Sequence, residues 1–174
     1  DLAPDEDGKE TARTVLKLEN KDYDVIVSEP SNPWFASVGS VFSHEFYELA
    51  RKRLKPGGIM VQWFHVYEMN DQIVEMVLRT FGASFPVMEI WDANEGDLIL
   101  LGSDRPWTTS VAELRKGYER ESVRRDLESI GLGRPELLLT RLFASQRIAS
   151  QIAGPGFIQT DGLPILEYQA PVAF

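Results

Sequence analysis

The chain has no cysteine and only two histidines among its 174 residues. The absence of cysteine excludes disulfides, thiolate zinc sites and cysteine nucleophiles, and it suits a reducing compartment such as the cytoplasm. His44 and His65 have neither triad partners nor other metal ligands at suitable spacing. We therefore expect no metal and no histidine-based catalytic site.

Two longer features are missing as well. No stretch approaches the roughly 18 apolar residues that span a membrane, and the amino end has no apolar core of a secretory signal. The chain also has no Gly-x-Gly-x-Gly motif, the loop with which many α/β proteins cradle a nucleoside or nucleotide. A nucleoside site in this sequence would lack its usual cradle.

Acidic residues exceed basic ones. The 27 Asp and Glu residues against 18 Lys and Arg residues give a net charge of −9. This balance argues against a nucleic-acid partner and favours a small cationic ligand such as an amine. The length and an apolar fraction of 43% indicate one globular domain with a core large enough to fold unaided.

Residues 23–34, with the sequence YDVIVSEPSNPW, form the most informative segment. Val25, Ile26 and Val27 are three consecutive β-branched residues, which is typical of a parallel strand buried on both faces. The acidic and proline-rich residues that follow fall at the carboxyl end of this strand. Open α/β sheets bind their ligands at that end.

The order of the predicted elements indicates an α/β fold. The elements are a weak helix or turn at 11–18, a strand at 23–28, helices at 44–54 and 70–82, a strand at 59–64, a hairpin of strands at 85–91 and 97–101, and helices at 110–130 and 135–153 before an extended tail. An antiparallel pair that closes a mostly parallel sheet is typical of a class I methyltransferase fold. We expect a partial Rossmann-like fold of this kind, with additional C-terminal helices.

The same pattern predicts three segments. Residues 1–12 are polar and acidic, so we expect a disordered segment or linker. Residues 13–104 would form the carboxyl half of the Rossmann-like domain. Residues 105–174 would form a helical extension that packs on the same domain.

Two segments, YDVIVSEPSNPW and VFSHEFYELARKRLKPGGIMVQWF, resemble the carboxyl half of the spermidine and spermine synthase family, the polyamine aminopropyltransferases. Three segments, SEPSNPW, QWFHVYEMND and TDGLPILEY, are similar to sequences of a spermidine-synthase-like branch of this family. Proteins of that branch are often fused to a membrane transporter-like region. The resemblance implies a cytoplasmic protein that transfers an aminopropyl group from decarboxylated S-adenosylmethionine to a diamine such as putrescine. It implies no metal, and a longer parent protein could be attached to a membrane.

The resemblance also implies the site residues. The family places an Asp-x-x-Asp-Pro loop directly after the strand, and Glu29 and Asn32 stand at those two acidic positions. Glu29 is therefore the candidate catalytic base, and Asn32, Trp34 and Gln62 are the candidate substrate contacts. Thr11 stands where the family has an acidic residue that contacts adenine, so it is the candidate cofactor contact.

Four of these candidates also have a purely structural alternative. Glu29 could be a solvated carboxylate or a helix cap, Asn32 could form an Asx-turn, and Trp34 could anchor the loop. Gln62 could be a strand-end amide that satisfies loop backbone. Glutamate in place of aspartate reaches one methylene further, and asparagine removes a charge that would help to bind a cation.

Two other functions remain open. An S-adenosylmethionine-dependent N-methyltransferase of the same fold would carry an Asn/Asp-Pro-Pro-aromatic motif after this strand, and Glu29-Pro30 matches it only in part. A non-catalytic α/β module that self-associates would explain the absent glycine-rich loop. A sheet that lacks its first strands exposes an edge, which predicts a homodimer. We expect this chain alone to be inactive as a transferase.

Overall fold

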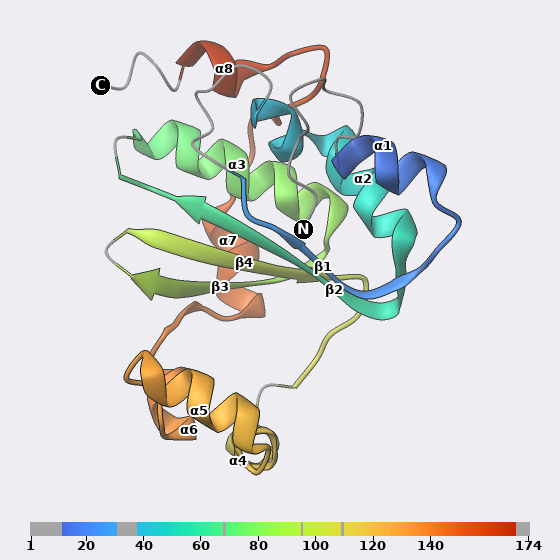
Figure 1. Ribbon diagram of the computed structural model, residues 1–174. Helices are drawn as coiled ribbons and strands as arrows, with labels where there is room; N and C mark the ends of the chain where they lie inside the picture. The colour runs from blue at the N-terminus through green and yellow to red at the C-terminus, as the bar shows by residue number, and fades with distance from the viewer. Residues whose placement is uncertain (1–11, 31–37, 68, 95, 109, 170–174) are drawn as a thin grey trace.

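The computed structural model describes residues 12–30, 38–67, 69–94, 96–108 and 110–169. A five-stranded sheet with the order β1-β2-β4-β3-β5 forms its centre (Figure 1). The strands are β1 (Tyr23–Ser28), β2 (Leu54–His65), β3 (Val87–Asn94), β4 (Asp97–Ser103) and β5 (Leu142–Ala144). β1 therefore lies at one edge of the sheet, and the short β5 lies at the other.

The α/β fold class is confirmed, but one detail of the predicted sheet is corrected. Among the described strands, β1 and β2 form a parallel pair, whereas β2–β4, β4–β3 and β3–β5 are antiparallel. The return strand of the hairpin, β4, inserts between β2 and β3. β1, β2 and β3 still run in one direction, but β4 separates β3 from the other two, so the sheet is mixed rather than mostly parallel.

The helices lie on both sides of the sheet. Their bounds are α1 (Ala12–Leu18), α2 (His44–Arg53), α3 (Asp71–Ser84), α4 (Val111–Tyr118), α5 (Glu121–Ser129), α6 (Pro135–Leu139), α7 (Gln146–Ile152) and α8 (Ile165–Gln169), with a 3-10 turn, η1, at Val38–Phe42. Figure 1 shows α1, α2 and α3 on one side of the sheet and α4, α5 and α6 on the other. None of the helices in the described ranges is long and apolar enough to cross a membrane.

The helix caps predicted from the sequence are confirmed. Asn70 precedes α3, and its side chain accepts a hydrogen bond from the backbone N–H of Ile73 at 3.0 Å. Ser110 caps α4 in the same way through the N–H of Glu113. These side chains satisfy amide groups that have no partner within the first turn of a helix.

Several predicted boundaries are wrong. α3 continues through Gly82 to Ser84, since burial of the next aromatic side chain, Phe85, offsets the cost of about 1 kcal/mol for a glycine inside a helix. The helix predicted at 110–130 is two helices, because Tyr118 is buried and donates a hydrogen bond to the carbonyl of Leu132, which folds α5 back.

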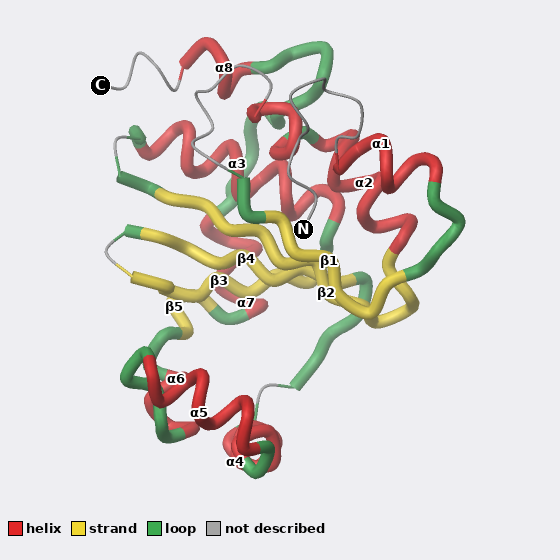
Figure 2. The backbone as a smooth tube through the Cα atoms, viewed as in Figure 1, coloured by secondary structure: helices red, strands yellow, loops and turns green. Residues whose placement is uncertain are grey.

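The carboxyl segment differs most from its prediction. The expected helix at 135–153 is interrupted by β5, which pairs with β3 and is drawn as a short strand in Figure 2. Arg141 fixes this pairing, because its guanidinium donates to Asp92 at 2.8 Å and its carbonyl accepts from the Asp92 N–H at 2.7 Å. The predicted extended tail contains α8, whose Leu166 is fully buried. The predicted division between residues 104 and 105 stays a prediction.

The main core lies between the sheet and the helices α2, α3 and α7. Phe81 of α3 is fully buried, and the centroid of its ring lies 5.1 Å from that of Tyr47 and 4.9 Å from that of Phe85. Gly102 of β4 leaves room for this cluster, because a Cβ there would lie 2.6 Å from Cε1 of Phe81. This packing holds α2 so that it begins near the carboxyl ends of β1 and β2.

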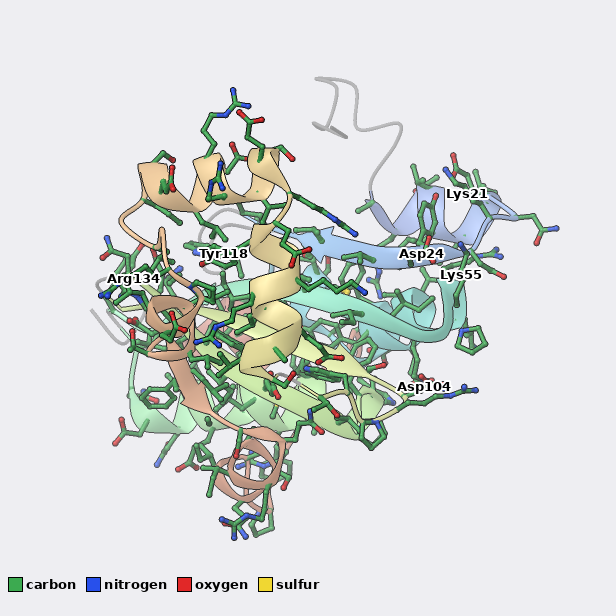
Figure 3. All side chains as sticks on the ribbon, turned by 90° about the horizontal axis from the view of Figure 1, so that it is seen from below. Lys21, Asp24, Lys55, Asp104, Tyr118 and Arg134 are labelled. Carbon is green, nitrogen blue, oxygen red and sulfur yellow. The ribbon has the colours of Figure 1, made fainter. Side chains whose placement is uncertain are left out.

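The amino end of β2 carries a turn that the sequence places between two elements. Gly57 has φ +79°, and its N–H donates to the Asp104 carboxylate at 2.9 Å. Lys55 donates to both oxygens of Asp24 at 3.0 and 2.8 Å, and Figure 3 shows these two side chains together. β2 therefore begins at Leu54, five residues earlier than predicted, and carries the turn as an irregularity in its pairing with β1.

Candidate functional site

Glu29 and Gln62 both lie at the carboxyl ends of the parallel strands β1 and β2. In the parallel pair, Ser28 is the register partner of Gln62, and Glu29 follows Ser28 directly at an exposed position. The Gln62 side chain is fully buried, and its Nε2 donates to the carbonyl of Trp63 at 2.9 Å and to that of Ser28 at 3.4 Å. Two strand ends that the sequence predicts separately therefore form one corner of the molecule.

The carbonyl oxygen of Gln62 is the unusual feature of this corner. Oε1 is buried, and no donor reaches it from the part of the chain that the structure describes. A buried amide oxygen without a donor costs free energy on the order of 1–3 kcal/mol. It therefore offers a hydrogen-bond acceptor at the strand end that also carries Glu29, and an N–H group would satisfy it.

Three predicted site residues lie outside the described residues. These are Thr11, Asn32 and Trp34. Their assigned roles, cofactor contact for Thr11 and substrate contact for Asn32 and Trp34, therefore stay predictions.

A cavity of about 330 Å³ lies at the start of α2 and is lined in part by the carboxyl segment. Arg13 of α1 donates to Asp161 through both terminal nitrogens, Nη1 at 3.0 Å to Oδ1 and Nη2 at 2.7 Å to Oδ2. Ser43, the cap of α2, accepts from the same Nη2 at 3.4 Å. The backbone N–H of Asp161 donates to Glu45 at 2.9 Å. The segment around Asp161 thus fastens α1 to α2.

Gln159 anchors this carboxyl segment from inside the protein. Its side chain is almost fully buried, donates to the carbonyl of Gly39 at 3.4 Å and accepts from the N–H of Leu166 at 3.0 Å. Its backbone N–H donates to the Thr80 hydroxyl, and its carbonyl accepts from the N–H of His44. A single residue thereby connects η1, α2, α3 and α8.

The two histidine side chains make other contacts. Nδ1 of His44 is 3.1 Å from the Ser84 hydroxyl. His65 is fully buried and stacks on Tyr67 with ring centroids 4.4 Å apart. Burial lowers the pKa of His65, and the nearby Asp97 carboxylate opposes that change. Within the described residues, no group of three or more His, Asp or Glu side chains could hold a metal ion.

Comparison with known proteins gives the family. The model of the spermine/spermidine synthase domain matches residues 6–92, which is half of the 174 residues. The chain belongs to this family. The crystal structure of a probable spermidine synthase from Corynebacterium glutamicum ATCC 13032 is similar in fold, with a TM-score of 0.56 and 20% sequence identity. The match covers 88% of this chain and 53% of that one, so the chain spans about half the length of that protein. No curated protein matches.

The match to the family model ends at residue 92, before the carboxyl segment that lines the cavity. Asp161 and Glu167 lie beyond residue 92, and sequence reasoning assigned them no role although TDGLPILEY was part of the resemblance. Arg13, two residues after Thr11, was also missed. Arg13 lies near the start of the chain, and Asp161 and Glu167 lie near its end. The sequence by itself does not show that these two segments are in contact.

The ion pair between Arg13 and Asp161 predicts a pH dependence of stability. The hydrogen bonds from Arg13 lower the pKa of the Asp161 carboxyl. A lowered pKa in the folded state stabilises the fold above the unfolded value of about 3.9, and the contribution is lost as the pH falls through the folded pKa. We expect Asp161→Asn to be less stable than the wild type at pH 7 by about 0.2–1 kcal/mol, the range for exposed pairs.

Urea unfolding between pH 7 and pH 3, values that bracket the carboxyl range of about 3.9, would measure this difference. The gap between wild type and Asp161→Asn should narrow as the pH falls. Asp126→Asn in α5 removes an exposed carboxylate with the same change of net charge and should show no such trend. A gap of constant size at all pH values would contradict the role of the ion pair.

Proposed function

We propose that this chain supplies the amine-binding half of a polyamine aminopropyltransferase, which transfers an aminopropyl group from decarboxylated S-adenosylmethionine to a diamine such as putrescine. The observation that carries the proposal is the corner formed by Glu29 and Gln62. The register of β1 and β2 brings the exposed Glu29 and the buried Gln62, whose amide oxygen has no donor among the described residues, to the same end of the parallel pair. An amine nitrogen can donate an N–H to the Gln62 oxygen and lose a proton to the Glu29 carboxylate.

The reaction needs both groups. The lone pair of the amine nitrogen attacks the methylene carbon bonded to the sulfonium sulfur, the carbon–sulfur bond breaks, and its electron pair leaves with sulfur as a neutral thioether. The nitrogen becomes positively charged and loses a proton, which Glu29 accepts as general base. The Gln62 oxygen accepts an N–H of the same nitrogen and orients its lone pair. In this proposal Asn32 and Trp34 contact the amine, and Thr11 lies on the nucleoside side.

The sequence lacks part of the site that would bind the nucleoside of the cofactor. The family's glycine-rich loop has no counterpart here, because the chain contains no Gly-x-Gly-x-Gly motif. We infer that a nucleoside-binding segment outside this sequence is needed for turnover. The chain alone would then bind an amine without binding the cofactor.

Calorimetry with three ligands tests this division. We expect putrescine to bind to the chain and neither decarboxylated S-adenosylmethionine nor S-adenosylmethionine to bind at micromolar concentration. Micromolar binding of either nucleoside would overturn the inference that another segment is needed. Methyl transfer from S-adenosylmethionine to an amine would instead favour the N-methyltransferase.

A second candidate function, self-association, is favoured by the surface of β1. This strand lies at the edge of the sheet, and Val25 and Val27 are 50% and 66% exposed. Val27 neighbours Val61 of β2, so apolar side chains continue from the edge onto the sheet face. A free strand edge with an apolar face invites pairing with a second copy of the chain.

Light scattering after size-exclusion chromatography would test this self-association. We expect a dimer at high protein concentration and a monomer after Val27→Lys, because a lysine on the face opposes close packing. Ile130→Lys is the matched control, since Ile130 is 65% exposed and lies at the end of α5. A monomeric wild type, or equal dissociation by both variants, would count against self-association through β1.

A further inference from the structure

A buried histidine ends β2. His65 is fully buried, and its ring stacks on that of Tyr67 with centroids 4.4 Å apart and an angle of 23° between the two planes. Trp63, two residues earlier on the same face of the strand, has its ring centroid 5.2 Å from that of the imidazole. Tyr67 is 43% exposed, so it forms the outer member of the stack. The mechanism proposed at Glu29 makes no use of this imidazole.

The neighbouring strand places a carboxylate opposite the imidazole. His65 and Asp97 are register partners in the antiparallel pair of β2 and β4, and side chains at such positions have Cβ atoms about 4.5–5.5 Å apart. Oδ1 of Asp97 is buried, and no donor in the described part of the chain reaches it. A protonated imidazole carries an N–H on both ring nitrogens. The carboxylate therefore favours a proton on His65, whereas the surrounding rings oppose it.

The stack also joins two turns of the chain. The N–H of Val66 donates to the carbonyl of Gly96 at 2.8 Å, and Gly96 has φ +98° in the turn between β3 and β4. A Cβ on Gly96 would lie 3.6 Å from Cδ1 of Tyr67, so the Tyr67 ring rests on this turn. Displacement of Tyr67 would loosen the turn and the exit of β2 together.

Two opposing effects set the charge of His65. Burial lowers its pKa, the Asp97 carboxylate raises it, and the net change is a lowering. Beyond β4, Asp92 of β3 is paired with Arg141 at 2.8 Å. The other ring neighbours are aromatic side chains of β2 and Tyr67, which carry no charge near neutral pH. Two further acidic residues, Glu68 and Glu95, lie outside the described residues.

We propose that His65 is a proton-sensitive latch: when its imidazole takes up a proton on mild acidification, the stack with Tyr67 opens and the exit of β2 separates from the β3–β4 turn. A charged imidazole is disfavoured among buried rings and gains by reaching water. Because the folded pKa is lowered, the latch contributes fully above the unfolded value of about 6.5 and is lost as the pH falls through the folded pKa. The latch goes beyond the proposed transferase, since it acts on the fold whether or not any group is transferred at Glu29.

NMR of the wild type tests the latch without any variant. The ring signals of His65 and the amide signals of Val66, Tyr67 and Gly96 are followed between about pH 8 and pH 5, values that bracket the usual histidine pKa of about 6.5. All four should change together, with a midpoint below about 6.5. Over the same range the Val66 amide should lose protection from hydrogen exchange, relative to the intrinsic exchange rate at each pH. A His65 titration that leaves the three amides unchanged, or no titration of His65 in this range, would overturn the proposal.

Three variants separate a proton effect from a packing effect. His65→Phe keeps a ring in the stack but has no proton site, so the Val66 amide should stay protected on acidification. Asp97→Asn removes the carboxylate that helps the buried imidazole to hold a proton, so the loss of protection should be larger than in the wild type. His44→Gln is the control, because His44 contacts Ser84 instead, and it should behave as the wild type does. Equal loss of protection in the wild type and His65→Phe, or disappearance of the loss in His44→Gln, would contradict the latch.

Discussion

Replacing Phe81 with alanine is expected to lower the free energy of unfolding by about 3–5 kcal/mol, the range for removal of a buried aromatic side chain. The ring is fully buried between Tyr47 of α2 and Phe85 at the end of α3. Gly102 of β4 approaches it from the sheet. These neighbours belong to three elements that are fixed by their own hydrogen bonds, so the cavity left by the mutation cannot collapse fully.

Urea unfolding followed by circular dichroism would measure this loss. Phe143→Ala is the control, because Phe143 is 64% exposed in β5 and its removal should change the free energy of unfolding by less than about 0.5 kcal/mol. Gly102→Ala should also destabilise, since its Cβ would lie 2.6 Å from Phe81. A loss below about 1 kcal/mol for Phe81→Ala, outside the range for buried rings, would show that this cluster does not hold α2 and α3 to the sheet.

Local signals predict the first part of the fold well. The strand at Tyr23–Ser28 has the predicted bounds, and α2 begins at the predicted His44. Asn70 starts α3 as its position before an apolar stripe indicates. Each of these features depends on residues within one or two turns of the chain, where capping and periodicity act.

Long-range contacts decide the parts that the sequence does not predict. β5 replaces a helical pattern because it pairs with the edge of β3 and is fixed by Arg141 and Asp92, which are 49 residues apart. α8 forms where an extended tail is expected, because Leu166 enters a core with Phe42 and Phe64. In both places tertiary packing outweighs local propensity.

The candidate site also has one part that the sequence predicts and one part that it does not. Glu29 and Gln62 can be placed from the sequence, because each ends a strand and parallel strands end at one edge of the sheet. The cavity at Glu167 cannot, because Arg13 and Asp161 are 148 residues apart and only the folded chain brings them together. Sequence motifs with no assigned role are therefore best examined in pairs once the fold is known.

In a form of the protein that carries aminopropyltransferase activity, Glu29→Gln is expected to lower kcat about 100- to 10,000-fold. This is the range for loss of a general base. Glutamine keeps the size of the side chain and one acceptor oxygen, but it replaces the other oxygen with an NH2 donor and cannot accept the proton that the amine nitrogen releases. Because the amide still offers an acceptor to the amine, KM for the amine should change much less than kcat. Steady-state kinetics with putrescine as the varied substrate would separate the two parameters.

Two further variants serve as controls for this experiment. Asp24→Asn removes an exposed carboxylate from the other end of the same strand, where it pairs with Lys55, and should leave kcat unchanged. Glu29→Asp keeps the base and restores the residue that the family has at this position, so it should retain most of the activity. If Glu29→Gln is as active as the wild type, the base is another group. If Asp24→Asn loses as much activity as Glu29→Gln while Glu29→Asp retains it, the effect is one of total charge and not of proton transfer at the strand end.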